Sequence, residues 1–547
     1  MARARWLLAT SLAVTAHAVA APGAGQAKPP ATPDLPRPPR EQTTSSATVV
    51  LPPVPAFEIP AAPAGTRSVR ELRVAGRPLL DKNVTVSGYV TWIYDCVAQL
   101  RRPGEAITAV QARIDADPTQ CERPRFYLGD TRDTPPERSL WVVGVPRPYN
   151  KIELERIEKK HRTPANYPDR CEPDPARPRA TSCADLQIGD YVTVRGRFAQ
   201  SSPHGERNSD GLIVLRSVSP AKPPTGKPRM KAVRAPSAKL APLKVRRVQR
   251  PPASAWATDL SVRAANEAAR AYMQKDYRGA AERYTSALQA WDGNHSAWYG
   301  LAVTEIARND WRAAAKAMAR AFELAPDEPM YALLYGHALY EVVIVEAREA
   351  AARRDKIPVA QAMPDLAKAD FSRAEQLLRH AVQLDDSLWR AHYYLGRFAR
   401  DQGRAQDAAR ALTKALSFAP PQPGPWVALG ELYRRWDYPE LAARVAEQGT
   451  KVVTGAKASD VWYVLAMAHD DRQQHEPAIA AFTRALELDP AHTKALFQRG
   501  QALLRLRRYA EAKRDLEAAL ASPRSLPEFA VQMANKMLAD IAERAPR

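Results

Sequence analysis

Side chains that could do chemistry are few in this chain, and they form no familiar catalytic pattern. The sequence contains no P-loop, no dinucleotide-binding glycine fingerprint, no H-E-x-x-H and no nucleophile elbow. His337, His392 and His469 fall in the C-terminal half without a carboxylate or cysteine partner at metal-binding spacing. The sequence therefore predicts a protein that is not an enzyme and that holds no cofactor or metal.

The four cysteines are the next place where chemistry could occur. They are separated by 25, 50 and 12 residues, at Cys96, Cys121, Cys171 and Cys183. A zinc site is one interpretation, but no C-x2-C pair is present. An even count in an exported chain favours disulfides instead. Of the three pairings that four cysteines allow, we expect Cys96 with Cys121 and Cys171 with Cys183.

The first 20 residues have the pattern of a cleavable secretory signal. Arg3 and Arg5 precede an apolar run from Trp6 to Val14, and small residues in A-x-A order lie at 16–20. No cysteine follows the candidate cleavage site, so a lipid anchor is not expected, and no other segment is long enough to span a bilayer. The prediction is a periplasmic or secreted protein with no integral span in the mature chain. A retained N-terminal anchor is the alternative.

Two proline-rich segments divide the rest of the chain. Residues 21–66 contain 12 prolines and few aromatics, so they are predicted to form a disordered tether with polyproline II character. Residues 221–255 contain ten lysines and arginines and no acidic residue, within a chain of net charge +20. This basic linker would attract a polyanion such as nucleic acid, anionic lipid or an acidic envelope polymer. A solvated linker extended by self-repulsion is the equal alternative.

The C-terminal part repeats one phrase at a fixed spacing. Trp426, Leu429, Gly430 and Tyr433 spell W-x2-L-G-x2-Y, and Trp462 begins the phrase again 36 residues later. Three copies end at the same phase, on Pro326, Pro420 and Pro490. Each helix pair has an apolar face that only a neighbouring pair can bury, so the pairs must stack.

About seven such units fit within residues 256–547, one of them with an insertion near 341–370. The stretch from Glu341 to Arg354 is strongly helix-forming, which predicts a lengthened helix and then a loop. Glycines recur where the two helices of a pair are expected to cross closely, at Gly336, Gly396, Gly430 and Gly500.

These motifs resemble the tetratricopeptide repeat (TPR) family, which implies an all-α solenoid whose first helices line a concave wall. In the register of the family, the wall-lining positions are Tyr299, His337, Tyr340, Arg390, Tyr393, Arg397, Arg400, Glu431, Arg434, Tyr463, Lys494, Phe497 and Gln501. The middle of this wall is basic and aromatic, which suits an extended peptide with acidic and apolar side chains. A merely solvated charged face is the alternative. Chaperone-binding relatives use Lys and Asn where Tyr393 and Arg397 stand, so that chaperone tail is not an expected ligand.

Residues 67–220 have an alternating pattern instead of a helical one. Strands are predicted at Asn83–Tyr94, Arg125–Leu128, Leu140–Val145, Tyr191–Phe198 and Leu212–Ser217, with a helix at Lys151–His161. Three strands, a helix and two strands resemble the element order of an OB-fold barrel. That resemblance implies a face that stacks a ligand, with Tyr89, Trp92, Tyr94, Phe126, Tyr127 and Trp141 as candidates. Because strands bury alternate residues, most of these rings are expected to fill the barrel.

The predicted fold is therefore multidomain, with a small mainly-β OB-like barrel, disordered proline-rich linkers and a C-terminal TPR solenoid. The predicted function is an exported, non-catalytic scaffold for protein interaction or assembly in the bacterial envelope. One alternative is a glycan- or nucleic-acid-binding protein that acts through the barrel. A second is an intracellular RNA-associated protein, which requires that the signal is false.

Overall fold

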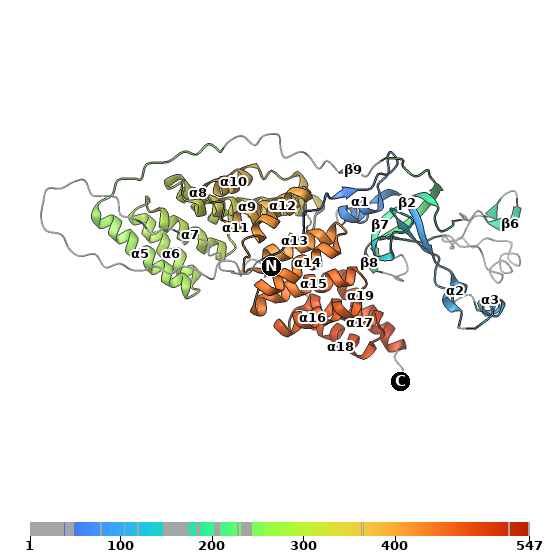
Figure 1. Ribbon diagram of the computed structural model, residues 1–547. Coiled ribbons are helices and arrows are strands. Elements are labelled where there is room, and N and C mark those ends of the chain that lie inside the picture. The colour runs from blue at the N-terminus through green and yellow to red at the C-terminus, as the bar shows by residue number, and fades with distance from the viewer. Residues whose placement is uncertain are drawn as a thin grey trace.

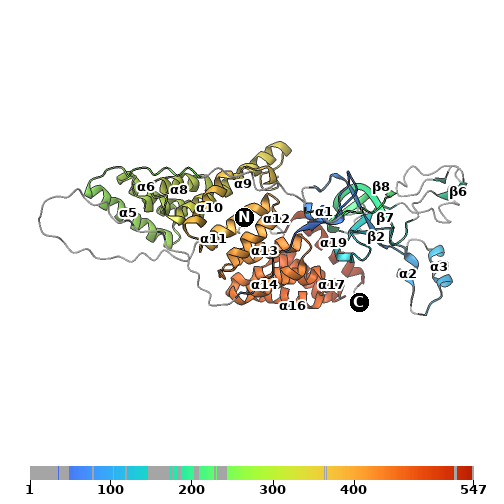
Figure 2. The ribbon, with the colours of Figure 1, turned by 45° about the horizontal axis from the view of Figure 1, so that its top comes forward.

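The computed structural model describes residues 35, 38, 49–76, 79–102, 104–117, 120–145, 173–174, 177–181, 186–201, 208–226, 229–230, 243–362, 364, 366–522 and 526–544. A β-barrel and a long array of helices make up this part of the chain, and the barrel lies beside the C-terminal half of the array (Figures 1 and 2). The predicted signal at 1–20, the helix predicted at Lys151–His161, Cys171 and Cys183 lie outside the described residues.

Five strands close the barrel. They are β2 (Asn83–Ile93), β3 (Phe126–Gly129), β4 (Leu140–Val143), β7 (Tyr191–Ser201) and β8 (Asn208–Pro220). Their order around the barrel is β2-β3-β4-β8-β7, with β7 returning to pair with β2. The β4–β8 pair is parallel and the others are antiparallel. A small five-stranded barrel, as predicted, is thus confirmed.

Alternation along the strands builds the barrel core. Val84, Val86 and Val90 of β2 are buried in one cluster with Leu128 of β3 and Val194 of β7. Polar or half-exposed residues lie between them on the opposite face, as expected for strands with one buried side. The core therefore follows directly from the Val-x-Val phrases in the sequence.

Several short elements lie before, between and after the barrel strands in the chain. They are α1 (Val69–Ala75), α2 (Cys96–Leu100), α3 (Ile107–Ala116), the 3-10 helix η3 (Pro136–Arg138) and two small pairings, β5 (Pro173–Asp174) with β6 (Arg177–Thr181) and β1 (Glu58–Ile59) with β9 (Arg229–Met230). A disulfide joins Cys96 to Cys121 and so ties the start of α2 to the chain entering β3. The predicted Cys96–Cys121 pairing is confirmed.

The array consists of seven consecutive helix pairs and a final helix within the described residues. The pairs are α5 (Ala255–Met273) with α6 (Tyr277–Ala290), α7 (His295–Ala307) with α8 (Trp311–Leu324), α9 (Pro329–Asp355) with α10 (Ser372–Leu384), α11 (Trp389–Asp401) with α12 (Ala405–Leu416), α13 (Pro423–Arg435) with α14 (Pro439–Val452), α15 (Ser459–Asp471) with α16 (His475–Leu488), and α17 (Thr493–Arg505) with α18 (Tyr509–Leu520); α19 (Glu528–Arg544) follows. Two 3-10 helices, η4 (Leu366–Lys368) and η5 (Gly455–Ala458), lie in the connections. The predicted all-α solenoid is confirmed.

Small residues let the helices of the array approach closely. A Cβ atom added to Gly396 of α11 would lie 2.6 Å from Leu412 Cγ of α12, within the same pair. At Gly430 of α13 the obstacle is different, because an added Cβ would lie 2.6 Å from Val464 Cγ1 of the following pair. Glycine thus serves contacts both within a repeat and between repeats.

The chain before the barrel also packs on the array. Phe57 and Ile59 are each 4% exposed and belong to the main core of the solenoid. Val49, Leu51 and Val54 lie against the same core. This packing differs from the disordered tether predicted for all of 21–66, because these apolar side chains find buried positions that proline content alone does not reveal.

Helix α1 joins the barrel to the array. Its Val69 and Leu72 are fully buried in the barrel core. On its other side Arg73 lies 3.0 Å from Asp437, in the turn between α13 and α14. The carbonyl oxygen of Val74 accepts a hydrogen bond from Arg435 Nε at 3.1 Å. One short helix therefore contributes to both domains.

Replacing Gly396 with alanine should destabilise the array. The new methyl group would overlap Leu412, and overpacking of this kind typically costs about 1–3 kcal/mol. Urea unfolding of the full chain, followed by circular dichroism at 222 nm, measures the loss.

Gly226→Ala is the control, because a Cβ there would lie 3.8 Å from Ala61 Cβ, which is an ordinary van der Waals contact. We expect that variant to unfold within about 1 kcal/mol of the wild type, because alanine without overlap acts mainly on the entropy of the unfolded chain. Equal effects of the two substitutions would contradict the close packing at Gly396.

Candidate partner-binding site

The residues predicted to line the concave wall include a cluster of aromatic and charged side chains from α9 and α11. The His337 ring stacks on Tyr394 with centroids 3.9 Å apart. The Arg397 guanidinium lies 4.9 Å from the centroid of the Tyr340 ring and 3.2 Å from the Glu341 carboxylate. The structure thus brings together the predicted residues His337, Tyr340 and Arg397, and adds the acid Glu341.

Protonation in this cluster follows from burial and charge. Burial lowers the pKa of His337 below its ordinary value, outweighing the nearby Glu341 carboxylate. Burial alone would raise the pKa of Glu341, but hydrogen bonding to His337 and the charge of Arg397 bring it below its ordinary value. At neutral pH the cluster therefore holds a neutral imidazole and an ionised Glu341–Arg397 pair.

A ladder of polar contacts runs between successive repeats along the wall. Each contact joins the first helix of one pair to the last residue of the first helix in the next pair. The Tyr340 hydroxyl donates to Asp401. Arg434 donates to both carboxylate oxygens of Asp471, at 2.5 and 3.0 Å, and Arg505 lies 2.6 Å from Asp470. The wall's charges are thus largely used to connect repeats.

The remaining predicted wall residues differ in how accessible they are. Tyr299, Tyr393 and Phe497 are buried, as are His337 and Tyr340 of the central cluster. Arg400 pairs with Asp401 at 2.9 Å. A half-buried group completes the set, comprising Arg390, Glu431, Tyr463, Lys494 and Gln501. That these thirteen residues contact a partner remains a prediction.

Three acids were missed by the sequence analysis. Glu341 follows His337 by one helical turn, a local signal that could have revealed it. Asp401 and Asp471 each end the first helix of a repeat, where they contact Tyr340 and Arg434 of the preceding repeat. Counting basic residues on one repeat at a time therefore overestimates the positive charge of the wall.

The barrel aromatics mostly pack on one another. Tyr127 lies between Trp92 and Trp141, with centroids 4.8 and 4.9 Å away. Arg125 lies over the ring of Tyr94, 4.6 Å from its centroid. Tyr89 packs edge-on against Tyr191 at 4.8 Å. Phe126 is 1% exposed inside the barrel core, so it cannot stack on a ligand as proposed from sequence.

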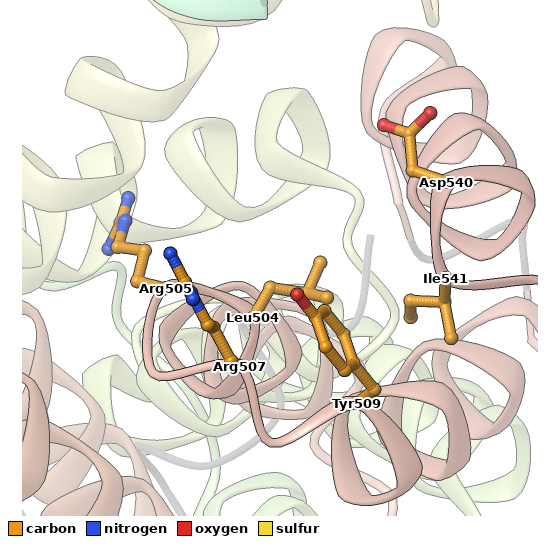
Figure 3. A pocket seen from close by; sticks show the side chains of 6 residues that line it. All are labelled: Leu504, Arg505, Arg507, Tyr509, Asp540 and Ile541. Atoms are coloured by element: carbon orange, nitrogen blue, oxygen red, sulfur yellow. The ribbon is translucent and has the colours of Figure 1, made fainter. Parts of the chain in front are cut away.

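A pocket between α17, α18 and α19 offers no stronger site. It is lined by Leu504, Arg505, Arg507, Tyr509, Asp540 and Ile541 (Figure 3). Its volume of about 210 Å³ is below the roughly 300–1,000 Å³ that is usual for small-molecule sites. Among the described residues no group of three or more His, Cys, Asp or Glu side chains is placed to hold a metal ion.

The inter-repeat ladder leads to a stability prediction. Asp471→Asn removes the charge that Arg434 contacts with two nitrogens, in a place where both side chains are largely covered. Loss of one partner of a partly buried pair should cost roughly 1–3 kcal/mol. Thermal and urea unfolding of the full chain measure the change.

Glu487→Gln provides a matched control, since Arg484 and Glu487 lie 2.6 Å apart with both side chains about half exposed. Exposed pairs of this kind contribute at most about 1 kcal/mol. If the two variants were equally stable, burial would not explain the strength of the Arg434–Asp471 contact.

Comparison with known proteins agrees with the repeat pattern. Models of the tetratricopeptide repeat match residues 271–338, 359–423, 459–492 and 481–514. No curated protein matches the chain.

Solved structures resemble the array in fold, at low identity. A chain of the APC/C hetero-tetramer Cut9-Hcn1 is 13% identical with a TM-score of 0.37; the match covers 52% of this chain and 48% of that one. YrrB, a TPR protein with an unusual peptide-binding site, is 18% identical with a TM-score of 0.30, over 41% of this chain and 99% of that one. The type IV pilus biogenesis factor PilW is 16% identical with a TM-score of 0.32, over 42% and 94%.

The family matches contain the terminal prolines Pro326, Pro420 and Pro490, and they lie on both sides of α13 and α14. The clearest copy of the W-x2-L-G-x2-Y phrase lies in α13, between the matches that end at 423 and begin at 459. The array of helix pairs is therefore built of tetratricopeptide repeats.

Proposed function

We propose that this chain is an exported, non-catalytic scaffold whose TPR array binds a partner protein, or an extended segment of one, along its concave wall. The observation that carries the proposal is the stacking of seven helix pairs, which presents their first helices side by side as one surface. Such repeats typically bind proteins, and the partner is to be assembled or positioned in the bacterial envelope.

The chemistry of the wall refines the kind of partner. Because Arg397 and Arg434 are paired with Glu341 and Asp471, the wall is close to charge balance at these positions. A partner would therefore gain more from aromatic and apolar contacts and from hydrogen bonds than from a long acidic tract. The sequence predicted a peptide with acidic and apolar side chains, and the paired charges of the wall reduce the weight of the acidic ones.

Export is supported by two features of the chain. The first 20 residues have the signal pattern, and the Cys96–Cys121 disulfide suits an oxidising compartment. Within the described residues no helix is both long enough and apolar enough to cross a membrane.

The partner site is tested by a charge reversal on the wall. A partner found by proximity labelling in the native host is quantified in pull-downs with purified full-length variants. Glu431→Lys, on the first helix α13, should weaken its capture about tenfold, which corresponds to about 1.4 kcal/mol.

Glu447→Lys makes the same substitution at an exposed position of the second helix α14 and should bind like the wild type. Loss of capture by Glu447→Lys with retention by Glu431→Lys would move the site away from the concave wall.

Export is tested on the native protein. N-terminal sequencing should give a mature chain that starts at position 19 or 21, directly after one of the two A-x-A motifs. Alkylation without reductant should leave Cys96 and Cys121 unlabelled. An intact Met1 on the native chain would remove the export argument.

A further inference from the structure

Phe57 is enclosed by three aromatic rings of the array. Its ring centroid lies 6.2 Å from that of Tyr433, 5.2 Å from that of Trp436 and 5.8 Å from that of Tyr438. Two of the three contacts are edge-on, and aromatic pairs at such spacings add about 0.5–1.5 kcal/mol each beyond the buried area. Tyr433, Trp436 and Tyr438, at the end of α13 and in the turn to α14, are called the aromatic cage below.

The backbone of Phe57 indicates a specific fit. Its φ angle is 51°, in the left-handed region that bulky residues rarely adopt. A conformation of this kind costs about 1–3 kcal/mol and persists only where the surroundings favour it. Here the side chain is 4% exposed, so burial of the ring offsets the unfavourable backbone. The cage thus selects one pose of Phe57.

The neighbours of Phe57 extend the contact in both directions. Before it, Val49, Leu51 and Val54 pack against the array core, with prolines interspersed at 52, 53 and 55. After it, Ile59 is buried and pairs with Arg229 through the two-stranded β1–β9 sheet. Proline-rich extended chains lose little entropy on binding, and aromatic-lined grooves are a recurrent way to recognise them.

The rim of the cage belongs to the barrel. The Arg70 guanidinium of α1 lies over the Tyr438 ring, 4.5 Å from its centroid, and donates to the carbonyl oxygen of Trp436. Phe57 and α1 are separated by only 11 residues, so a filled cage also keeps α1 beside the turn between α13 and α14. Occupancy of the cage and attachment of the barrel are therefore coupled.

We propose that the aromatic cage is a binding site for a proline-rich extended peptide with an aromatic anchor, and that the chain fills it with its own residues 49–59. This segment is called the latch. Because the latch is tethered, its effective concentration at the cage is in the millimolar range or above, so a free peptide of the same sequence competes poorly with it. Removing the anchor ring should open the site to a peptide supplied in trans. The cage is separate from the concave-wall site, and it exists whether or not the wall binds a partner.

The test uses the full chain and a fluorescent peptide of residues 49–63. Fluorescence anisotropy should show that Phe57→Ala binds this peptide at least tenfold more tightly than the wild type does. The same peptide with alanine in place of Phe57 should bind the Phe57→Ala chain at least tenfold more weakly than the native peptide. Phe57→Leu, which keeps an apolar side chain but no ring, should also admit the native peptide, and circular dichroism verifies that both variants are folded.

Val50→Ala is the matched control, because Val50 lies in the same segment and is 70% exposed. That variant should exclude the peptide as the wild type does. The proposal is overturned if folded Phe57→Ala and Phe57→Leu chains bind the peptide no better than the wild type. It is also overturned if the alanine peptide binds as well as the native one. Neither result depends on the pull-downs with Glu431→Lys, so the proposals for the cage and for the concave wall are tested independently.

Discussion

Close approach of neighbouring helices is the constraint on which this molecule depends. A helix pair with one apolar face is stable only if the next pair covers it, and coverage requires small residues where backbones cross. Gly396 shows this within a pair and Gly430 shows it between pairs, since a single added carbon would overlap a neighbouring side chain at either place. Neighbouring repeats stack in the same way, so equivalent helix positions face each other from one repeat to the next. A polar contact that fits between two repeats can therefore recur along the array.

The ladder on the concave wall is a consequence of that regular spacing. Tyr340 with Asp401, Arg434 with Asp471 and Asp470 with Arg505 occupy equivalent places in three different steps. The group that the earlier repeat supplies to the contact is the hydroxyl of Tyr340, the guanidinium of Arg434 or the carboxylate of Asp470. The helix positions that make the contact are equivalent in all three cases. The two ion pairs among these contacts also neutralise charge on the wall, so the wall differs from a simple basic groove. A partner must therefore fit between contacts that the array already makes.

The sequence predicted what is local and periodic. The TPR phrase, its prolines and the Val-x-Val strands repeat over short distances, so the helix pairs and the barrel could be placed before the structure was available. The contacts of Asp401 with Tyr340 and of Asp471 with Arg434 could not be predicted, because Tyr340 and Arg434 lie one repeat away and no short motif links them to these acids. The burial of Phe57 also could not be predicted, because composition averages over a proline-rich segment and a single buried ring changes that average little.

The barrel contacts the array at one repeat, and both helix packing and charge contribute to that contact. Trp426 and Tyr433, from the clearest copy of the TPR phrase, are both fully buried and hold α13 in place. The C-terminal end of a helix carries a partial negative charge, which favours nearby cations. Arg70 and Arg73 of α1 meet this end at the Trp436 carbonyl oxygen and at Asp437. The barrel is thus attached where packing makes the array rigid and where the helix end supplies a complementary charge, and the same turn contributes the rings that enclose Phe57.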